Sequence, residues 1–186
     1  MNQLPSLLNM LLSKHTRLRE FILLQVTICF AIGVSGATAV AQPKSLKEKL
    51  IGTWHLVSNI VERRDGTKVE QFGPNPKGIL IFAADGHFAT FNARTDLPKL
   101  ASGNRSRATP EENKAVIEGS FAYYSTYSAS DSDNVITIHI DGSTFANQIG
   151  TVQKRVVTSI TSEEMKFINP AATSGGSIQL VWERAN

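Results

Sequence analysis

From Thr53 to the C-terminus, short runs of β-branched and aromatic residues alternate with clusters of Gly, Pro, Asn, Asp and Ser. Turn signals recur at intervals of roughly 8–12 residues, a spacing typical of β-sandwiches and β-barrels. Asp65-Gly66 and Asp85-Gly86 are dipeptides that favour two-residue hairpin turns. The pattern predicts nine strands, over residues 53–61, 67–72, 78–82, 87–92, 119–127, 135–140, 151–160, 164–168 and 177–184.

Nearly every predicted strand is joined to the next by a short turn, as in an antiparallel meander. A meander of about eight to ten strands removes its exposed edges when it closes into a barrel. A barrel of this size has room inside for one small ligand. We therefore expect an all-β fold, an antiparallel up-and-down barrel of about eight to ten strands.

One short α-helix interrupts the strands. Thr109 is a capping residue, Pro110 suits the first helical position, and Glu112 lies three residues after the cap, where its carboxylate reaches back to the amide of Thr109. The predicted helix ends at Gly119. Residues 94–108 before it are polar and rich in Lys, Arg and Ser, and we expect a mobile loop that crosses one end of the sheet.

The N-terminus differs from the rest of the chain. Basic residues such as Lys14 and Arg19 precede residues 21–41, which contain no charged residue and end in Ala39-Val40-Ala41. This pattern predicts a signal peptide over residues 1–41, cut before Gln42, and an exported protein that is periplasmic or secreted. The alternative is an uncleaved anchor, since 21 uncharged residues are long enough to span a bilayer.

The predicted organisation is a signal peptide (1–41), a polar lead-in (42–49) and one barrel domain (50–186). Removing residues 1–41 leaves 16 basic and 15 acidic residues, a net charge of +1 without the leader. The basic residues form no stripe with interleaved aromatics, so we expect no nucleic-acid partner and no membrane contact beyond the leader. The single cysteine, Cys29, lies in the predicted leader, which leaves the domain without thiol chemistry.

Several segments of the predicted domain resemble a known family. Gly52-Thr53-Trp54 on the first predicted strand is similar to the G-x-W signature that opens lipocalin barrels, and Arg184 ends the last predicted strand. Other segments fall in the order and rough spacing of the lipocalin-like domain family of bacteria and fungi, namely residues 50–58, 108–112, 123–124, 139–143, 147–151 with Gln153 and Arg155, and 180–184. The resemblance covers residues 50–185. The chain departs from the pattern at Gln148, where many members carry an aromatic residue.

The resemblance implies a calycin-type barrel with a ligand cavity, and it names no ligand. It also implies structural roles for Trp54 and Arg184. Lipocalins place an arginine over the tryptophan, and a guanidinium stacked on an indole closes the base of the barrel through a cation–π contact.

Eight residues are candidate ligand-binding positions within such a lumen. They combine aromatic rings with a few polar groups, the usual composition of small-molecule sites. They are Phe88, Phe91, Tyr123, Tyr127, His139, Asn147, Gln153 and Arg155. The alternative for the tyrosines is that they fill the core with their hydroxyls hydrogen-bonded.

The directions of two of these candidates stay open. His139 shares a strand face with Thr137, opposite Ile136, Ile138 and Ile140. If the isoleucines face a packed layer, His139 faces solvent; if the lumen is partly polar, His139 points into it and pairs with a tyrosine of the neighbouring strand.

The partner of the Arg155 guanidinium also stays open. The guanidinium binds a carboxylate, or it pairs with Glu163 or Glu183 at the end of the barrel.

No motif of catalysis or metal binding is present. The sequence has no Gly-x-Ser-x-Gly, no phosphate-cradling glycine loop and no His-Glu-x-x-His. His55 and His87 are expected at the surface or rim. We therefore predict no catalytic residue, no metal and no cofactor.

The function expected from these observations is binding of a small, mostly apolar molecule in the lumen of an exported barrel. Two alternatives stay open. One is an isomerase, cyclase or hydratase that uses Tyr123 or Tyr127 and His139 as acid and base. The other is an envelope-associated interaction module that uses loops such as 94–108.

Overall fold

The computed structural model describes residues 42–173 and 175–185, and the predicted signal peptide lies outside these residues. Nine strands are present where the sequence predicts them. They are β1 (Gly52–Glu62), β2 (Lys68–Glu70), β3 (Lys77–Phe82), β4 (His87–Ala93), β5 (Ser120–Ser130), β6 (Val135–Ser143), β7 (Val152–Ile160), β8 (Glu164–Asn169) and β9 (Ser177–Arg184). The helices are α2 (Leu46–Leu50) and α3 (Pro110–Gly119), with 3₁₀ turns η1 (Arg105–Arg107) and η2 (Ala146–Gln148).

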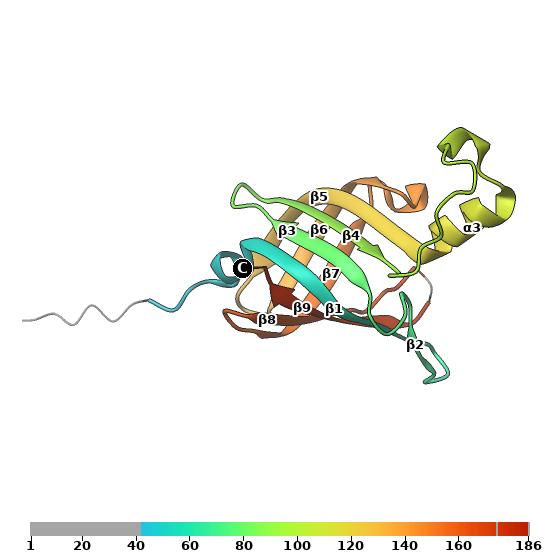
Figure 1. The fold of residues 1–186 in the computed structure, drawn as a ribbon. Coiled ribbons are helices and arrows are strands. Elements are labelled where there is room, and N and C mark those ends of the chain that lie inside the picture. The colour runs from blue at the N-terminus through green and yellow to red at the C-terminus, as the bar shows by residue number, and fades with distance from the viewer. Residues whose placement is uncertain (1–41, 174, 186) are drawn as a thin grey trace, which may run out of the picture. The chain divides into compact units, whose positions relative to one another are not determined.

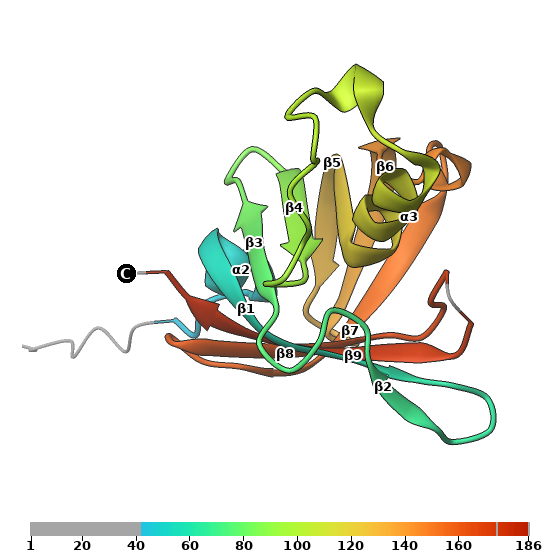
Figure 2. The ribbon, with the colours of Figure 1, turned by 45° about the vertical axis from the view of Figure 1, so that its right-hand side comes forward.

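The strands form a closed antiparallel barrel (Figures 1 and 2). The order in the sheet is β2-β1-β3-β4-β5-β6-β7-β8-β9, and β1 also pairs with β9, which closes the ring. The first residues of β1 pair with β3, whereas Ile60, Val61 and Glu62 pair with β2. β2 therefore pairs only with the C-terminal end of β1, and the other eight strands form the barrel wall. The predicted fold class is confirmed.

Side chains alternate between the lumen and the outside of the wall. Along β4, for example, Phe88, Thr90 and Asn92 are buried, and the residues between them are exposed. β1 breaks this alternation, because its pairing with β9 shifts register between Leu56 and Ser58, and Asn59 instead of Ser58 is buried. A register shift of this kind adds one residue to a strand and exchanges its two faces.

The short helix α2 packs at one end of the barrel, and it lies largely within residues 42–49, the predicted polar lead-in. Ser45 and Glu48 form a capping box at its start, and Leu46 and Leu50 are buried. The amide of Leu46 also donates to the Asp131 carboxylate in the β5–β6 turn. These contacts make α2 part of the packed domain. The signal for it was present, as the capping motif Ser45-x-x-Glu48 together with Leu46 and Leu50, which are four residues apart.

Arg184 and Trp54 join α2 to the barrel. The guanidinium carbon of Arg184 lies 4.0 Å from the centroid of the Trp54 ring, the stacking that the family resemblance implies. The indole of Trp54 donates to the carbonyl of Leu50 at 2.8 Å. Arg184 donates to the carbonyls of Lys49 at 2.8 Å and Ile51 at 2.9 Å. This end of the barrel is therefore closed by one arginine, one tryptophan and the end of α2.

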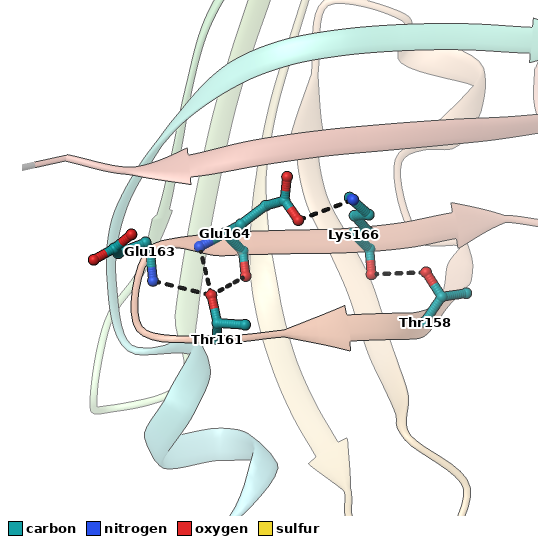
Figure 3. A network of polar contacts seen from close by, with 5 residues as sticks. All are labelled: Thr158, Thr161, Glu163, Glu164 and Lys166. Carbon is teal, nitrogen blue, oxygen red and sulfur yellow. Dashed lines mark hydrogen bonds and ion pairs between the residues drawn. The ribbon is translucent and has the colours of Figure 1, made fainter.

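The β7–β8 turn lies at the same end and also contacts Arg184. Figure 3 shows the polar contacts of the turn and of the two strands that it joins. The hydroxyl of Thr161 accepts from the amides of Glu163 at 3.2 Å and Glu164 at 2.9 Å, which holds the turn in shape. Glu164 and Lys166 form an exposed ion pair at 2.9 Å. The carbonyl of Ser162, within this turn, accepts from Nε of Arg184 at 2.6 Å.

The opposite end of the barrel carries the longer connections, and α3 leads there into β5 (Figure 1). The predicted capping box of α3 is present: the Thr109 hydroxyl accepts from the amide of Glu112, and the Glu112 carboxylate accepts from the amide of Thr109. Glu112 also accepts from the amide of Ala101 at 2.7 Å, so α3 is bonded to the 94–108 loop. In residues 42–173 and 175–185, no helix is both long and apolar enough to cross a membrane.

Candidate ligand-binding site

A cavity of about 70 Å³ lies in the lumen towards the end of the barrel that carries α3. Its wall includes Asn92 and Asn169, near the ends of β4 and β8, and Phe72, Gln148 and Thr173 from the connecting loops. The volume is well below the roughly 300–1,000 Å³ of pockets for drug-sized molecules. A ligand held wholly inside must therefore be small.

The cavity wall mixes apolar and polar side chains. The apolar part includes Leu80, Phe88, Phe121, Phe167, Leu180 and Trp182, and the polar part includes Asn59, Thr90, Asn92, Gln148, Arg155 and Asn169. Among the wall residues, none is Asp, Glu, Lys or His, so Arg155 is the charged group of the wall.

Four buried polar atoms of the wall have no hydrogen-bond partner among the described residues. They are Asn59 Oδ1, Asn92 Oδ1, Gln148 Oε1 and Trp182 Nε1. An unpartnered buried polar group costs about 1–3 kcal/mol. The wall is therefore able to hydrogen-bond a molecule that enters the lumen.

Three of the eight predicted positions come together in this wall, namely Phe88, Tyr123 and Arg155. The rings of Phe88 and Tyr123 lie 5.4 Å apart between centroids. Nη2 of Arg155, on β7, donates at 3.3 Å to the hydroxyl of Tyr123, on β5, and the two strands flank β6. Among the described residues no ion pair includes Arg155, so the alternative pairing with Glu163 or Glu183 is not formed.

Tyr127 is buried but does not line the cavity. Its ring packs edge-on against Phe82 with centroids 4.9 Å apart, and its hydroxyl donates to the carbonyl of Ala83 at 3.0 Å. Burial, and to a lesser extent the negative charge of Asp85, raises the pKa of the Tyr127 phenol. This tyrosine therefore fills the core, the alternative reading of the sequence.

Phe91 and His139 lie on the outside of the barrel. This corrects the expected placement of Phe91 in the lumen, and it decides against the lumen for His139, whose direction the sequence left open. Phe91 is 44% exposed because it alternates with the inward-facing Thr90 and Asn92. His139 is exposed and pairs across the sheet with Thr126, while the isoleucines beside it are buried in the lumen. A Tyr–His pair is not formed, because Tyr123 and Tyr127 face the lumen and His139 faces away from it. The acid–base pair of the enzyme alternative is therefore not assembled.

The last two candidates lie beside the cavity without lining it. Asn147 is exposed on η2, whereas the next residue, Gln148, is buried in the wall, because successive residues of a 3₁₀ turn point in different directions. Gln153 is half-buried, and its amide nitrogen lies 3.4 Å from the hydroxyl of Thr151.

Three polar residues of the cavity wall are not among the positions predicted from the sequence, namely Asn59, Asn92 and Gln148. For Asn92 the signal was available, since it shares a face with Phe88 and Thr90 at intervals of two residues.

A shallow groove continues from the cavity onto the rim. It has a volume of about 220 Å³ and shares Gln71, Phe72, Phe121 and Thr173 with the cavity wall. Ile117 of α3, 68% exposed, and Phe145, 43% exposed, form its outer side. Apolar side chains therefore extend from the lumen to the outside. The described part of the chain contains no cluster of three His, Cys, Asp or Glu that would hold a metal ion.

Comparison with known proteins gives distant structural similarities and one family. A lipocalin-like protein from Bacteroides uniformis ATCC 8492 is 13% identical, with 74% of this chain and 99% of that chain covered and a TM-score of 0.41. A redesigned β barrel is 12% identical, with 77% and 100% covered and a TM-score of 0.39. A bovine odorant binding protein, in complex with a selenium-containing odorant, is 13% identical, with 77% and 74% covered and a TM-score of 0.38.

No curated protein matches the chain. The model of the lipocalin-like domain matches residues 51–185, most of the chain, and this protein therefore belongs to the lipocalin-like domain family.

Proposed function

We propose that this protein binds a small, mostly apolar molecule inside the barrel and does no chemistry on it. The observation that carries the proposal is the cavity of about 70 Å³ in the lumen, which continues into the apolar groove beside α3. The cavity wall and the groove provide phenyl rings for the apolar body of a ligand, and the unpartnered polar atoms are available to a polar group on it.

Native mass spectrometry of the protein isolated from its own host tests this proposal. A co-purified molecule is expected as a mass above that of the chain. Thr90→Phe places a phenyl ring in the lumen, because Thr90 is buried in the cavity wall. Thr126→Phe makes the same change on the outer face of the neighbouring strand, where Thr126 is exposed.

The bound mass is expected to disappear in T90F and to persist in T126F, with thermal denaturation showing that both variants fold. A bound mass that survives in folded T90F would place the ligand outside the lumen and contradict the proposal.

We also propose that the protein is exported and that residues 1–41 are removed. The support is the basic start, the uncharged run over 21–41 and the Ala39-Val40-Ala41 site. Intact-mass measurement of the protein from the host envelope and medium is expected to give a chain that begins at Gln42. An intact chain in the membrane fraction would favour the anchor instead.

A further inference from the structure

Arg155 is a charged side chain buried in the cavity wall without a counter-charge. It is 6% exposed, and it forms no ion pair among the described residues. No acidic residue belongs to the cavity wall. A buried charge is usually paired, because removing it from water without a partner is costly. The positive charge of Arg155 therefore faces a cavity that supplies no anion of its own.

The guanidinium of Arg155 has donors to spare. A guanidinium carries five N–H donors in a planar fork. Among the described residues, Nη1 donates to the carbonyl of Lys154 at 2.8 Å and Nη2 donates to the hydroxyl of Tyr123 at 3.3 Å. Since the Tyr123 hydroxyl accepts from Arg155, its own hydrogen is available to donate. Arg155 and Tyr123 thus present several donors from one corner of the cavity, an arrangement that suits the two oxygens of a carboxylate.

The other unpartnered groups of the wall are consistent with an oxygen-rich group in the lumen. Nε1 of Trp182 is buried without a partner, and an indole N–H only donates, so it requires an acceptor. The amides of Asn59, Asn92 and Gln148 offer an oxygen or an NH₂ depending on their rotation.

We propose that the barrel selects small carboxylic acids, whose carboxylate is bound by Arg155 and Tyr123 and whose hydrocarbon part lies along Phe88 and Phe121. This inference rests on the proposed function, since it names the class of molecule that the same cavity binds. Phe121 belongs to both the cavity wall and the rim groove, which gives a hydrocarbon chain a path to the open end.

The two tryptophans of the chain allow a direct test by nuclear magnetic resonance. Trp182 lines the cavity, and its indole N–H is buried without a partner among the described residues. The indole N–H of Trp54 is bonded to Leu50 at the closed end and serves as an internal control. Butanoate, hexanoate and benzoate are titrated beside their primary amides, which have nearly the same shape and no charge. We expect the Trp182 signal to move, the Trp54 signal to stay, and at least one acid to bind about 10-fold or more tightly than its amide.

Three variants separate the role of Arg155 from charge in general. Arg155→Gln is expected to remove the preference for the acid, and Tyr123→Phe to weaken it several-fold. Lys154→Gln is the matched control, because it removes one positive charge from the exposed neighbour of Arg155 and is expected to leave binding unchanged. If R155Q does not fold, Arg155→Lys keeps the charge, loses the planar fork and is expected to bind the acid more weakly than the wild type.

Equal binding of acid and amide, or an equal loss of the preference in R155Q and K154Q, would overturn the carboxylate inference and leave the ligand-binding function standing. A neutral co-purified molecule, lost in T90F, would do the same. If no probe moves the Trp182 signal and no molecule co-purifies with the protein, both the inference and the proposed function fail.

Discussion

Replacing Arg184 by alanine is expected to lower the free energy of unfolding strongly, although this residue at the closed end of the barrel is only half-buried. In the structure its guanidinium stacks on Trp54 and donates to three carbonyls, those of Lys49, Ile51 and Ser162. These groups come from the end of α2, the start of β1 and the β7–β8 turn. R184A therefore removes the side chain that connects β9 to the N-terminal α2 and β1 and to the β7–β8 turn.

The magnitude follows from the contacts. A cation–π contact at a partly exposed site contributes about 1 kcal/mol. Three hydrogen bonds contribute about 1 kcal/mol each, because the carbonyls regain water when the arginine is absent. These contributions overlap, so the expected loss in the free energy of unfolding is about 3 kcal/mol. For a domain of this size that corresponds to a fall of about 9 °C in Tm.

Urea and thermal denaturation, followed by tryptophan fluorescence and circular dichroism, measure this loss. Arg184→Lys keeps the charge but cannot reach three carbonyls, and we expect about half of the loss, ~1.5 kcal/mol. Arg64→Ala removes an exposed arginine from the β1–β2 turn and is expected to change stability by less than about 0.5 kcal/mol. The reasoning is refuted if R184A is as stable as R64A.

Three further predictions concern packing and titration. Leu50→Ala, at a position with no exposed surface, is expected to cost about 2–5 kcal/mol in urea denaturation, and a value below about 1 kcal/mol would mean that α2 is not part of the core. Gly176→Ala is expected to destabilise by more than about 2 kcal/mol in the same assay, because the new Cβ would lie 2.1 Å from the carbonyl oxygen of Glu62 at a φ of +83°; an unchanged midpoint would contradict that contact. Because the pKa of Tyr127 is raised in the folded protein, its contribution to stability is complete below the ordinary value of 10.0 and is lost as pH rises through the folded value. Ultraviolet titration is expected to show one phenol ionising after the others, absent in Tyr127→Phe, and simultaneous ionisation of all phenols would contradict the raised pKa.

Much of the fold was predictable because it depends on local patterns. Strand alternation has a period of two residues, so the inward placement of Phe88, Tyr123 and Arg155 follows from their strands alone once one face is known to be buried. The capping residues of α3 likewise act within one turn of helix.

The candidate site was harder to predict, because which face is buried depends on distant partners. Ile136, Ile138 and Ile140 turned inward and His139 outward, and the sequence left both orientations open. Tyr127 faces inward as well, yet it packs below the cavity against Phe82, a contact between residues 45 positions apart in the chain.

By itself, the sequence determined the nine strands, the helix α3 and the family, because alternation, turn dipeptides and motifs are written in neighbouring residues. Only the tertiary structure decided what lines the cavity. The register shift between Leu56 and Ser58 arises from the pairing of β1 with β9, and it turns Asn59 into the lumen. The approach of Arg155 to Tyr123 requires side chains from β7 and β5, the two strands that flank β6, to meet inside the barrel. Closure and register depend on hydrogen bonds between strands far apart in the chain, so no local pattern encodes them.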